Sequence, residues 1–435
     1  MTFGSLTGQR VQDFVREYYG SILLTSVVLV ISGLMHLLWY YSPLRLTEDT
    51  WVRGLDVHLS QYPFNTRLMQ SQATLLVQHI FSLPVKESFM IVQGGLTMIL
   101  GPLFYRYLRQ LRVGKAWSLV GLFLLMTAYP ILGAHFSPTY TWDDIWMYVF
   151  GVLCFSALTR EEPLKASLYF TLGCFARGQM LLFLPIFVLS LWWLQGQYTV
   201  KRLLGSLLLP LLLYGSFRAI LYQAEDPKRW ELFFFNFRDS ARSTDTIVSM
   251  IIAFGVMWFL CVVGQKMLRE RPMTYPERVI FWGAFLSVPV VTITTLLFTN
   301  ARETRIFFPP FVFVIPLSVV ALRRIWDRVS SRCGPLTWTF IPSAVAVCLV
   351  LGVAYGGNLF SEWDFGRNVQ LRRQIAGVHL GTAWIILQGW IISTLQNHIS
   401  VRSLRRKDSS RPSEAIVKTA GTVIHQPRTD SFFPR

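Results

Sequence analysis

The amino-acid sequence predicts an all-α polytopic membrane protein. Of its 435 residues, 52% are apolar and 15% are aromatic, and the mean hydropathy is +0.42. Only 15% of the residues are charged, well below the roughly 25% that is usual in soluble domains. Windows of about 17 to 21 mostly apolar residues recur along the chain, and a helix of that length crosses a hydrocarbon core of about 30 Å.

We expect twelve membrane-spanning helices, within a range of ten to thirteen. The first apolar window lies too far from the N-terminus and is too long to be a cleaved signal peptide, so we interpret it as a true span. Residues 1–400 are therefore expected to form one transmembrane domain. The windows begin near Ser21, Ser88, Ala116, Ile145, Ala166, Gln179, Leu203, Ile247, Val279, Ile306, Thr337 and Val378.

The distribution of Lys and Arg predicts an orientation in the plasma (inner) membrane with both termini in the cytoplasm. In that orientation, the cytoplasmic segments hold twice as many basic residues as the outer loops. The net charge of +17 is then explained by topology and by attraction to anionic lipids, and its pattern does not indicate a nucleic-acid partner. Residues 401–435 are polar and basic and are predicted to be a disordered cytoplasmic tail.

The cysteines indicate neither disulfides nor a zinc site. Cys154, Cys174, Cys261 and Cys348 fall in apolar windows, and Cys333 falls in an expected cytoplasmic loop. The outer loops therefore carry no cysteine, and no CxxC pair is present.

The longest expected outer loop covers residues 42–86. Its second half, "RLMQSQATLLVQHIFSL" from Arg67, places Leu68, Leu75, Leu76 and Ile80 at near-helical spacing with glutamines opposite. This pattern predicts an amphipathic helix that lies on the membrane rather than crossing it.

The first half of this loop contains the acidic stretch "PLRLTEDTWVRGLDVH", with Glu48, Asp49 and Asp56. On a helix that begins near Thr47, Asp49 and Arg53 would share one face. These acids either cap a helix and face solvent, or provide a general base or a ligand for a divalent cation beside the membrane.

A second acidic stretch, "HFSPTYTWDDIWMYVF", places Asp143 and Asp144 immediately before an apolar helix. One negatively charged carboxylate at that position is stabilised by the positive end of the helix dipole. Two adjacent carboxylates exceed what a cap requires. With His135 nearby in the sequence, they could also hold Mg²⁺ or Mn²⁺.

Two further segments place arginine at or within the membrane. Arg177 lies in the turn of a predicted membrane hairpin, where it either faces a cavity or a partner or extends to the interface. The stretch "TLLFTNARETRIFFPPFVFVIPL" is expected to form a tight outer turn. In it, Arg302 and Arg305 suit a phosphate or diphosphate group, with Glu303 orienting one of them, or they contact lipid headgroups.

Three of these segments resemble motifs of the GT-C superfamily of membrane glycosyltransferases, in particular its small bacterial members. "YPFNTRLMQSQ" is similar to a "PF-x-x-R-x-L" stretch that follows the first acidic loop of those proteins. "GCFARGQMLLFLPIFVL" looks like their "R-E/G-x-x-L-L-x-L-P" hairpin, and "NARETRIFFPPF" looks like their "E-x-R-x-F-x-P" turn. The resemblance covers roughly residues 21–320.

This resemblance implies a GT-C-like fold and inverting transfer of a sugar from a polyprenyl-phosphate carrier, outside the membrane. It implies that Asp49, or failing it Asp56, deprotonates the acceptor hydroxyl. The carrier phosphate would be held by Arg177, Arg302 and Arg305. The acids and the histidine that would assist at the acceptor or at a metal ion, Mg²⁺ or Mn²⁺, are Glu48, His135, Asp143, Asp144 and Glu303.

Two other classes of membrane protein use similar ligands. A transporter or flippase of a lipid-linked saccharide would need arginines for phosphate, but it would line a path through the whole membrane with charges. A multispanning polysaccharide polymerase shares the lipid-diphosphate chemistry, although its largest loop usually lies later in the chain. Whichever class applies, membrane lipids and a lipid-linked sugar are the expected partners. The sequence predicts no oligomeric state.

Overall fold

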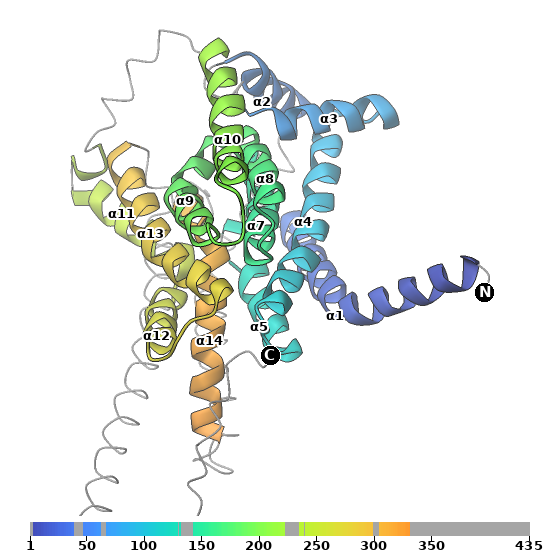
Figure 1. Ribbon diagram of the computed structural model, residues 1–435. Helices are drawn as coiled ribbons and strands as arrows, with labels where there is room; N and C mark the ends of the chain where they lie inside the picture. The colour runs from blue at the N-terminus through green and yellow to red at the C-terminus, as the bar shows by residue number, and fades with distance from the viewer. Residues whose placement is uncertain are drawn as a thin grey trace, which may run out of the picture.

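The computed structural model describes residues 3–38, 47–61, 67–128, 130–131, 142–221, 235–238, 240–298 and 304–330. Within these ranges the protein consists of thirteen α-helices and short 3₁₀ helices, with no β-strand (Figure 1). The all-α prediction is therefore confirmed.

The helices follow one another along the chain with short connections, apart from the stretches that the structure does not describe. The α-helices are α1 (Phe3–Leu38), α2 (Glu48–Ser60), α3 (Leu68–Phe81), α4 (Val85–Gln110), α5 (Lys115–Met126), α7 (Asp144–Thr159), α8 (Pro163–Ala176), α9 (Leu184–Trp193), α10 (Val200–Leu221), α11 (Ser240–Phe254), α12 (Met257–Arg269), α13 (Tyr275–Phe298) and α14 (Phe311–Ser330). The 3₁₀ helices are η3 (Gly178–Phe183), η5 (Phe235–Phe237) and η6 (Thr304–Phe307).

Four helices in the described part of the chain are long and apolar enough to cross a membrane. They comprise residues 17–34 of α1, and α4, α10 and α13 in full. These four helices indicate a membrane protein, but the expectation of twelve spans is wrong. The windows expected from Thr337 and Val378 lie outside the described residues.

The span count was too high because an apolar window does not require an unbroken helix. The window from Ile247 is divided into α11 and α12, of 15 and 13 residues, by Gly255, whose φ is 52°. The window from Ala116 contains α5, a helix of 12 residues. At a rise of about 1.5 Å per residue, α5 is only about 18 Å long, too short for a hydrocarbon core of about 30 Å.

Contacts between neighbouring helices establish their relative directions. α1 and α4 run antiparallel, because Glu17 of α1 pairs with Arg109 near the end of α4. Ser26, further along α1, lies against Met98, which comes earlier in α4. α7 runs parallel to α4, since Phe89 packs on Trp142 near the start of both helices. At their far ends, the Ser156 hydroxyl of α7 donates a hydrogen bond to Gln110 of α4.

The same alternation brings α2, the starts of α3, α4 and α7, the end of α8, and η6 to one end of the bundle, which we call the site end. The opposite end carries the α7–α8 and α9–α10 connections, where Tyr198 donates a hydrogen bond to the Glu161 carbonyl oxygen (2.5 Å). α3 runs crosswise to α4 at the site end (Figure 1).

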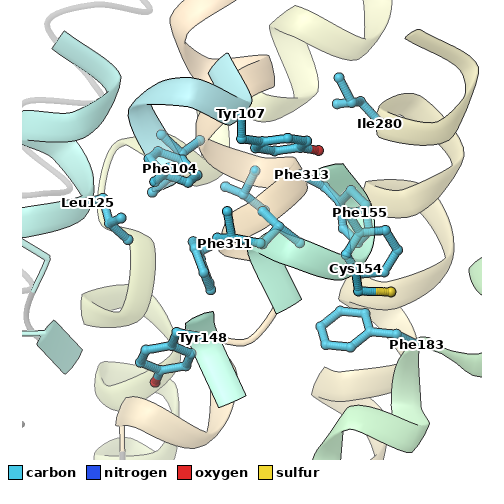
Figure 2. Close-up of a cluster of buried hydrophobic side chains, with 14 of the residues drawn as sticks. Phe104, Tyr107, Leu125, Tyr148, Cys154, Phe155, Phe183, Ile280, Phe311 and Phe313 are labelled. Atoms are coloured by element: carbon cyan, nitrogen blue, oxygen red, sulfur yellow. The ribbon is translucent and has the colours of Figure 1, made fainter. Parts of the chain in front are cut away.

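Aromatic side chains around α14 form the centre of the bundle. Every residue from 311 to 321 is buried. Phe155 packs edge-on against both Phe313 and Phe183, with ring centroids 4.5 and 5.6 Å apart, and Tyr148 packs edge-on against Phe311 (Figure 2). α14 therefore holds α7 and η3 in fixed positions, and η6 lies directly before it.

At the opposite end, the sequence "TYPE" begins α13 with a capping box. Glu277 is fully buried, and its carboxylate accepts hydrogen bonds from the Thr274 backbone N–H (2.8 Å) and hydroxyl (3.0 Å). Arg271 donates to the same carboxylate. This arrangement satisfies helix-end donors that would otherwise be unpaired, with Pro276 in the first turn.

Candidate anion-binding site at the site end of the bundle

Asp144, the first residue of α7, is in contact with two arginines from distant parts of the chain. Its Oδ1 forms an ion pair with Arg177 Nη1, at the end of α8. Its Oδ2 accepts a hydrogen bond from Arg305 Nη1 of η6 at 3.2 Å. Asp144 is completely buried and Arg177 is 5% exposed, so these charges are held away from solvent.

A break between α8 and η3 delivers Arg177 to this site. α8 ends at Ala176, and Arg177 has extended backbone angles (φ −156°, ψ 125°) before the chain turns into the 3₁₀ helix η3. Gly178 follows, and a Cβ atom there would lie 2.6 Å from the Tyr214 hydroxyl oxygen. The glycine thus lets α10 approach the chain closely at the point where Arg177 turns inward.

Asp143 has different neighbours from Asp144. Its Oδ1 accepts a hydrogen bond from the Gln70 backbone N–H at 3.4 Å, and its Oδ2 lies 3.9 Å from His58 Nδ1. The His58 ring stacks on Trp142, with centroids 4.6 Å apart and an angle of 13° between the planes. Asp143 is 1% exposed.

The start of α3 frames both carboxylates with polar side chains. The indole N–H of Trp142 donates to Ser71 Oγ (3.0 Å), and that of Trp146 donates to Gln70 Oε1 (3.0 Å). Gln70 and Ser71 are fully buried, whereas Leu76 and Ile80 are 59% and 60% exposed. The helix predicted from Arg67 is therefore present as α3, and it directs its polar face toward the site.

Burial shifts the proton affinity of the Asp143–His58 pair. It raises the pKa of Asp143 from 3.8 to about 7, although three neighbouring guanidinium groups oppose the rise. Burial, and then the nearby arginines, lower the pKa of His58 from 6.5 to about 3. His58 is consequently neutral near pH 7, and its approach to Asp143 is a dipolar contact rather than an ion pair.

Counted over the described residues, the site carries an excess of positive charge. Arg67 lies close enough to act electrostatically on both Asp143 and His58. Together with Arg177 and Arg305 it sets three guanidinium groups against two carboxylates. Such an excess in a buried environment suits an anionic ligand, and guanidinium groups bind phosphate well.

Two buried hydroxyl groups adjoin these charges. Tyr148 lies one helical turn after Asp144, and the charge of Arg305 acts on it electrostatically. Thr304 directly precedes Arg305 in the chain. Within the described residues, neither the Tyr148 hydroxyl nor the Thr304 hydroxyl has a hydrogen-bond partner. Buried hydroxyl groups usually have partners, so these two are available to a ligand.

The predicted acids of the first loop lie elsewhere. Asp49 and Asp56 are on the exposed side of α2, whose buried face carries Trp51, Leu55 and His58. Glu48 instead caps α4: its carboxylate accepts hydrogen bonds from the backbone N–H groups of Val85 (2.5 Å) and Lys86 (3.4 Å).

Three other predicted site residues, His135, Arg302 and Glu303, lie outside the described residues. Of the predicted residues, the structure brings together Asp143, Asp144, Arg177 and Arg305.

The described residues do not fit a site for Mg²⁺ or Mn²⁺. Among them, no group of three His, Cys, Asp or Glu side chains could hold a metal ion. Asp144, one of the two proposed ligands, is already neutralised by two guanidinium groups, which would repel a divalent cation.

Besides the two hydroxyl groups of Tyr148 and Thr304, three residues of the site were given no role from the sequence: His58, Arg67 and Gln70. His58 could have been found from its spacing, since Trp51, Leu55 and His58 recur at intervals of four and three residues on one helical face. Arg67 stands within the "PF-x-x-R" stretch. Gln70 acts through its backbone N–H as well as its side chain, and no residue type signals that role.

No protein-family profile, curated protein or solved structure matches this chain.

Proposed function

We propose that this protein is a membrane glycosyltransferase that takes a sugar from a polyprenyl-phosphate donor by an inverting mechanism. The observation that supports this proposal most is the buried cluster of Asp144, Arg177 and Arg305 at one end of a bundle that contains four candidate membrane spans. An anion site at the end of membrane helices is where the phosphate of a lipid carrier would lie, with its chain in the bilayer.

The three arginines that act on Asp143, which are Arg67 and the two arginines of the cluster, come from the three segments that resemble glycosyltransferase motifs. Arg67 stands in "YPFNTRLMQSQ", Arg177 in "GCFARGQMLLF" and Arg305 in "NARETRIFFPPF". Segments far apart in the chain thus meet in one place. In a sugar transfer, the carrier phosphate is the leaving group, and guanidinium groups that neutralise it lower the barrier to its departure.

The placement of the charges favours transfer over transport. A transporter needs polar groups along a path through the membrane. In the described part of the chain, Arg177 is at the site end of its helix, and Arg218 is in the last turn of α10, which shares that end. The ion pairs of Arg109, Arg160, Arg271 and Arg324 are at the opposite end.

The proposal includes an orientation. With the N- and C-termini in the cytoplasm of a cell with a plasma (inner) membrane, the site end faces outward. The excess of Lys and Arg in the connections at the opposite end supports this orientation. The polyprenyl-phosphate-linked sugar would then react with an acceptor outside the cell.

Binding of polyprenyl phosphate to the purified protein tests the donor site. Arg305→Lys keeps the positive charge but loses the planar fork of donors, so we expect the affinity to fall by roughly tenfold, about 1.4 kcal/mol. Arg177→Lys should have at least as large an effect, because Arg177 is more deeply buried. The measurement is titration of detergent-solubilised protein with labelled polyprenyl phosphate.

Arg53→Lys is the matched control, because Arg53 is an exposed arginine of α2 at the same end of the bundle. Its affinity should equal that of the wild type. Equal affinities in all four proteins would contradict the donor site and indicate a general attraction to acidic headgroups. If the protein moved a labelled lipid-linked sugar across vesicle membranes without transferring the sugar, it would be a flippase and not a transferase.

A further inference from the structure

Asp143 and Asp144 are adjacent in the sequence but differ in what occupies their oxygens. Both oxygens of Asp144 face guanidinium groups. Asp143 Oδ1 accepts a hydrogen bond from the Gln70 backbone N–H, whereas its Oδ2 receives no hydrogen bond from the described residues. The nearest basic nitrogen, His58 Nδ1 at 3.9 Å, is too far for a hydrogen bond.

An inverting sugar transfer needs one base that takes a proton from the acceptor hydroxyl. Asp144 is unsuited, because it forms ion pairs with two arginines, and nearby positive charges stabilise the ionised form of a carboxylate. Asp49 and Asp56 are exposed on the outer side of α2, away from the buried face that carries His58. Among the described residues, Asp143 is the remaining carboxylate beside the arginine cluster.

We propose that Asp143 is the proton acceptor of the reaction, and that Asp144 holds the donor-binding arginines in place. This inference rests on the proposed function. The acceptor oxygen forms a bond to the anomeric carbon of the sugar as its proton passes to Asp143 Oδ2. The bond between that carbon and the phosphate oxygen breaks, and the carrier phosphate leaves with the electron pair.

His58 acts as a positioning residue in this scheme. Its ring is fixed by stacking on Trp142, and it borders Asp143 Oδ2 without binding it tightly. Gln70 fixes the other oxygen from the start of α3. The carboxylate is thus oriented from two helices, while one oxygen stays free to take a proton. Adjacent acids held in contrasting surroundings are a common way of separating two chemical roles.

The test uses the full-length protein in lipid vesicles with a labelled set of polyprenyl-phosphate hexoses and pentoses. Sugar release to water, or transfer to an added hydroxyl acceptor, is measured beside donor binding. Asp143→Asn keeps the shape of the side chain, so donor binding should be unchanged while turnover falls by roughly a hundredfold or more. Asp49→Asn and Asp56→Asn should keep normal turnover.

A second variant separates chemistry from structure. In Asp143→Ala the side chain is shorter by a carboxyl group, and added formate should restore part of the turnover by acting as the missing base. A purely structural role would give no rescue. Asp144→Ala should lose donor binding, and formate should not restore its turnover.

Several outcomes would overturn the inference. Normal turnover in Asp143→Asn would do so, as would loss of turnover in Asp49→Asn or Asp56→Asn alone. Loss of donor binding in Asp143→Asn would indicate that Asp143 has a structural role rather than a catalytic one. By contrast, a wild-type protein that neither binds polyprenyl phosphate nor releases sugar would contradict the proposed function itself.

Discussion

At the scale of single residues, the buried pair of His58 and Asp143 shows how one environment acts oppositely on an acid and a base. Burial disfavours the charged form of each group, so it raises the pKa of Asp143 to about 7 and lowers the pKa of His58 to about 3. The folded state therefore favours a neutral form of both side chains over a wide range of pH.

These shifts predict pH dependences of stability with opposite signs. Between about pH 4 and pH 7, the unfolded chain releases the Asp143 proton while the folded protein retains it, so stability due to Asp143 falls as pH rises. Between about pH 3 and pH 6.5, unfolded His58 binds a proton that folded His58 does not, so stability due to His58 rises with pH.

Replacing each residue in turn should remove its own contribution to the pH dependence of stability. We expect that His58→Gln becomes less stable relative to the wild type as pH rises from 4 to 7, and that Asp143→Asn becomes more stable relative to the wild type over that interval. Thermal unfolding of the three proteins in one detergent, measured at several pH values, checks this. If the stability difference from the wild type changed with pH in the same direction in both variants, the assigned pKa shifts would be contradicted.

At the scale of helices, close approach depends on single glycines. In α12, a Cβ atom at Gly264 would lie 2.3 Å from the carbonyl oxygen of Leu317, so α12 touches the backbone of α14 at this point. A residue without a side chain allows the backbones of two helices to approach this closely.

Gly264→Ala should therefore destabilise the protein by roughly 1–3 kcal/mol, the usual cost of overpacking. Gly205→Ala in α10 is the control, because a Cβ atom there meets nothing within 4 Å. Alanine also has the higher helix propensity, so the control should be neutral or slightly stabilising. Thermal unfolding of the two variants is the measurement, and equal stability would argue against the tight α12–α14 contact.

The sequence predicted where most of these helices lie but not where they break. Apolar windows at Ser88, Leu203 and Val279 correspond to the long helices α4, α10 and α13. Gly255 divides another window because its left-handed backbone ends one helix before the next begins. Hydropathy averages residues over a window, so it does not register one residue of unusual φ.

At the scale of the whole molecule, the antiparallel course of the helices gathers distant charges at one end. The sequence indicated Asp144, Arg177 and Arg305 separately, from their unusual positions beside or within apolar windows. It could not show that they contact each other, because that depends on which helices are neighbours. It favoured Asp49 on the resemblance alone, and the face that α2 buries carries His58 instead.

The proposed orientation predicts which end of the molecule a reagent outside the cell reaches. A cysteine at Ser60, which is exposed at the site end, should react with a membrane-impermeant maleimide in intact cells. A cysteine at Thr199, exposed between α9 and α10 at the opposite end, should react only after permeabilisation. The unmodified protein, which contains five cysteines, is the control; of these, Cys154, Cys174 and Cys261 are buried.

Reaction at Thr199→Cys alone in intact cells would reverse the orientation and place the site in the cytoplasm. Asn236, in another loop expected to be outside, is a poorer reporter, because it is buried and its side chain donates to the Leu296 carbonyl oxygen (2.8 Å).

The inverted polarity of α3 links the candidate site to whatever surrounds this helix. A helix of a water-soluble protein turns its apolar side inward, but α3 directs Gln70 and Ser71 inward and leaves Leu76, Ile80 and Phe81 exposed. Hydrocarbon around those side chains, rather than protein, would complete the packing of this wall. The alignment of Asp143, which Gln70 fixes, then depends on the thickness and fluidity of the bilayer, and a detergent that wets α3 poorly would relax the site without unfolding the bundle.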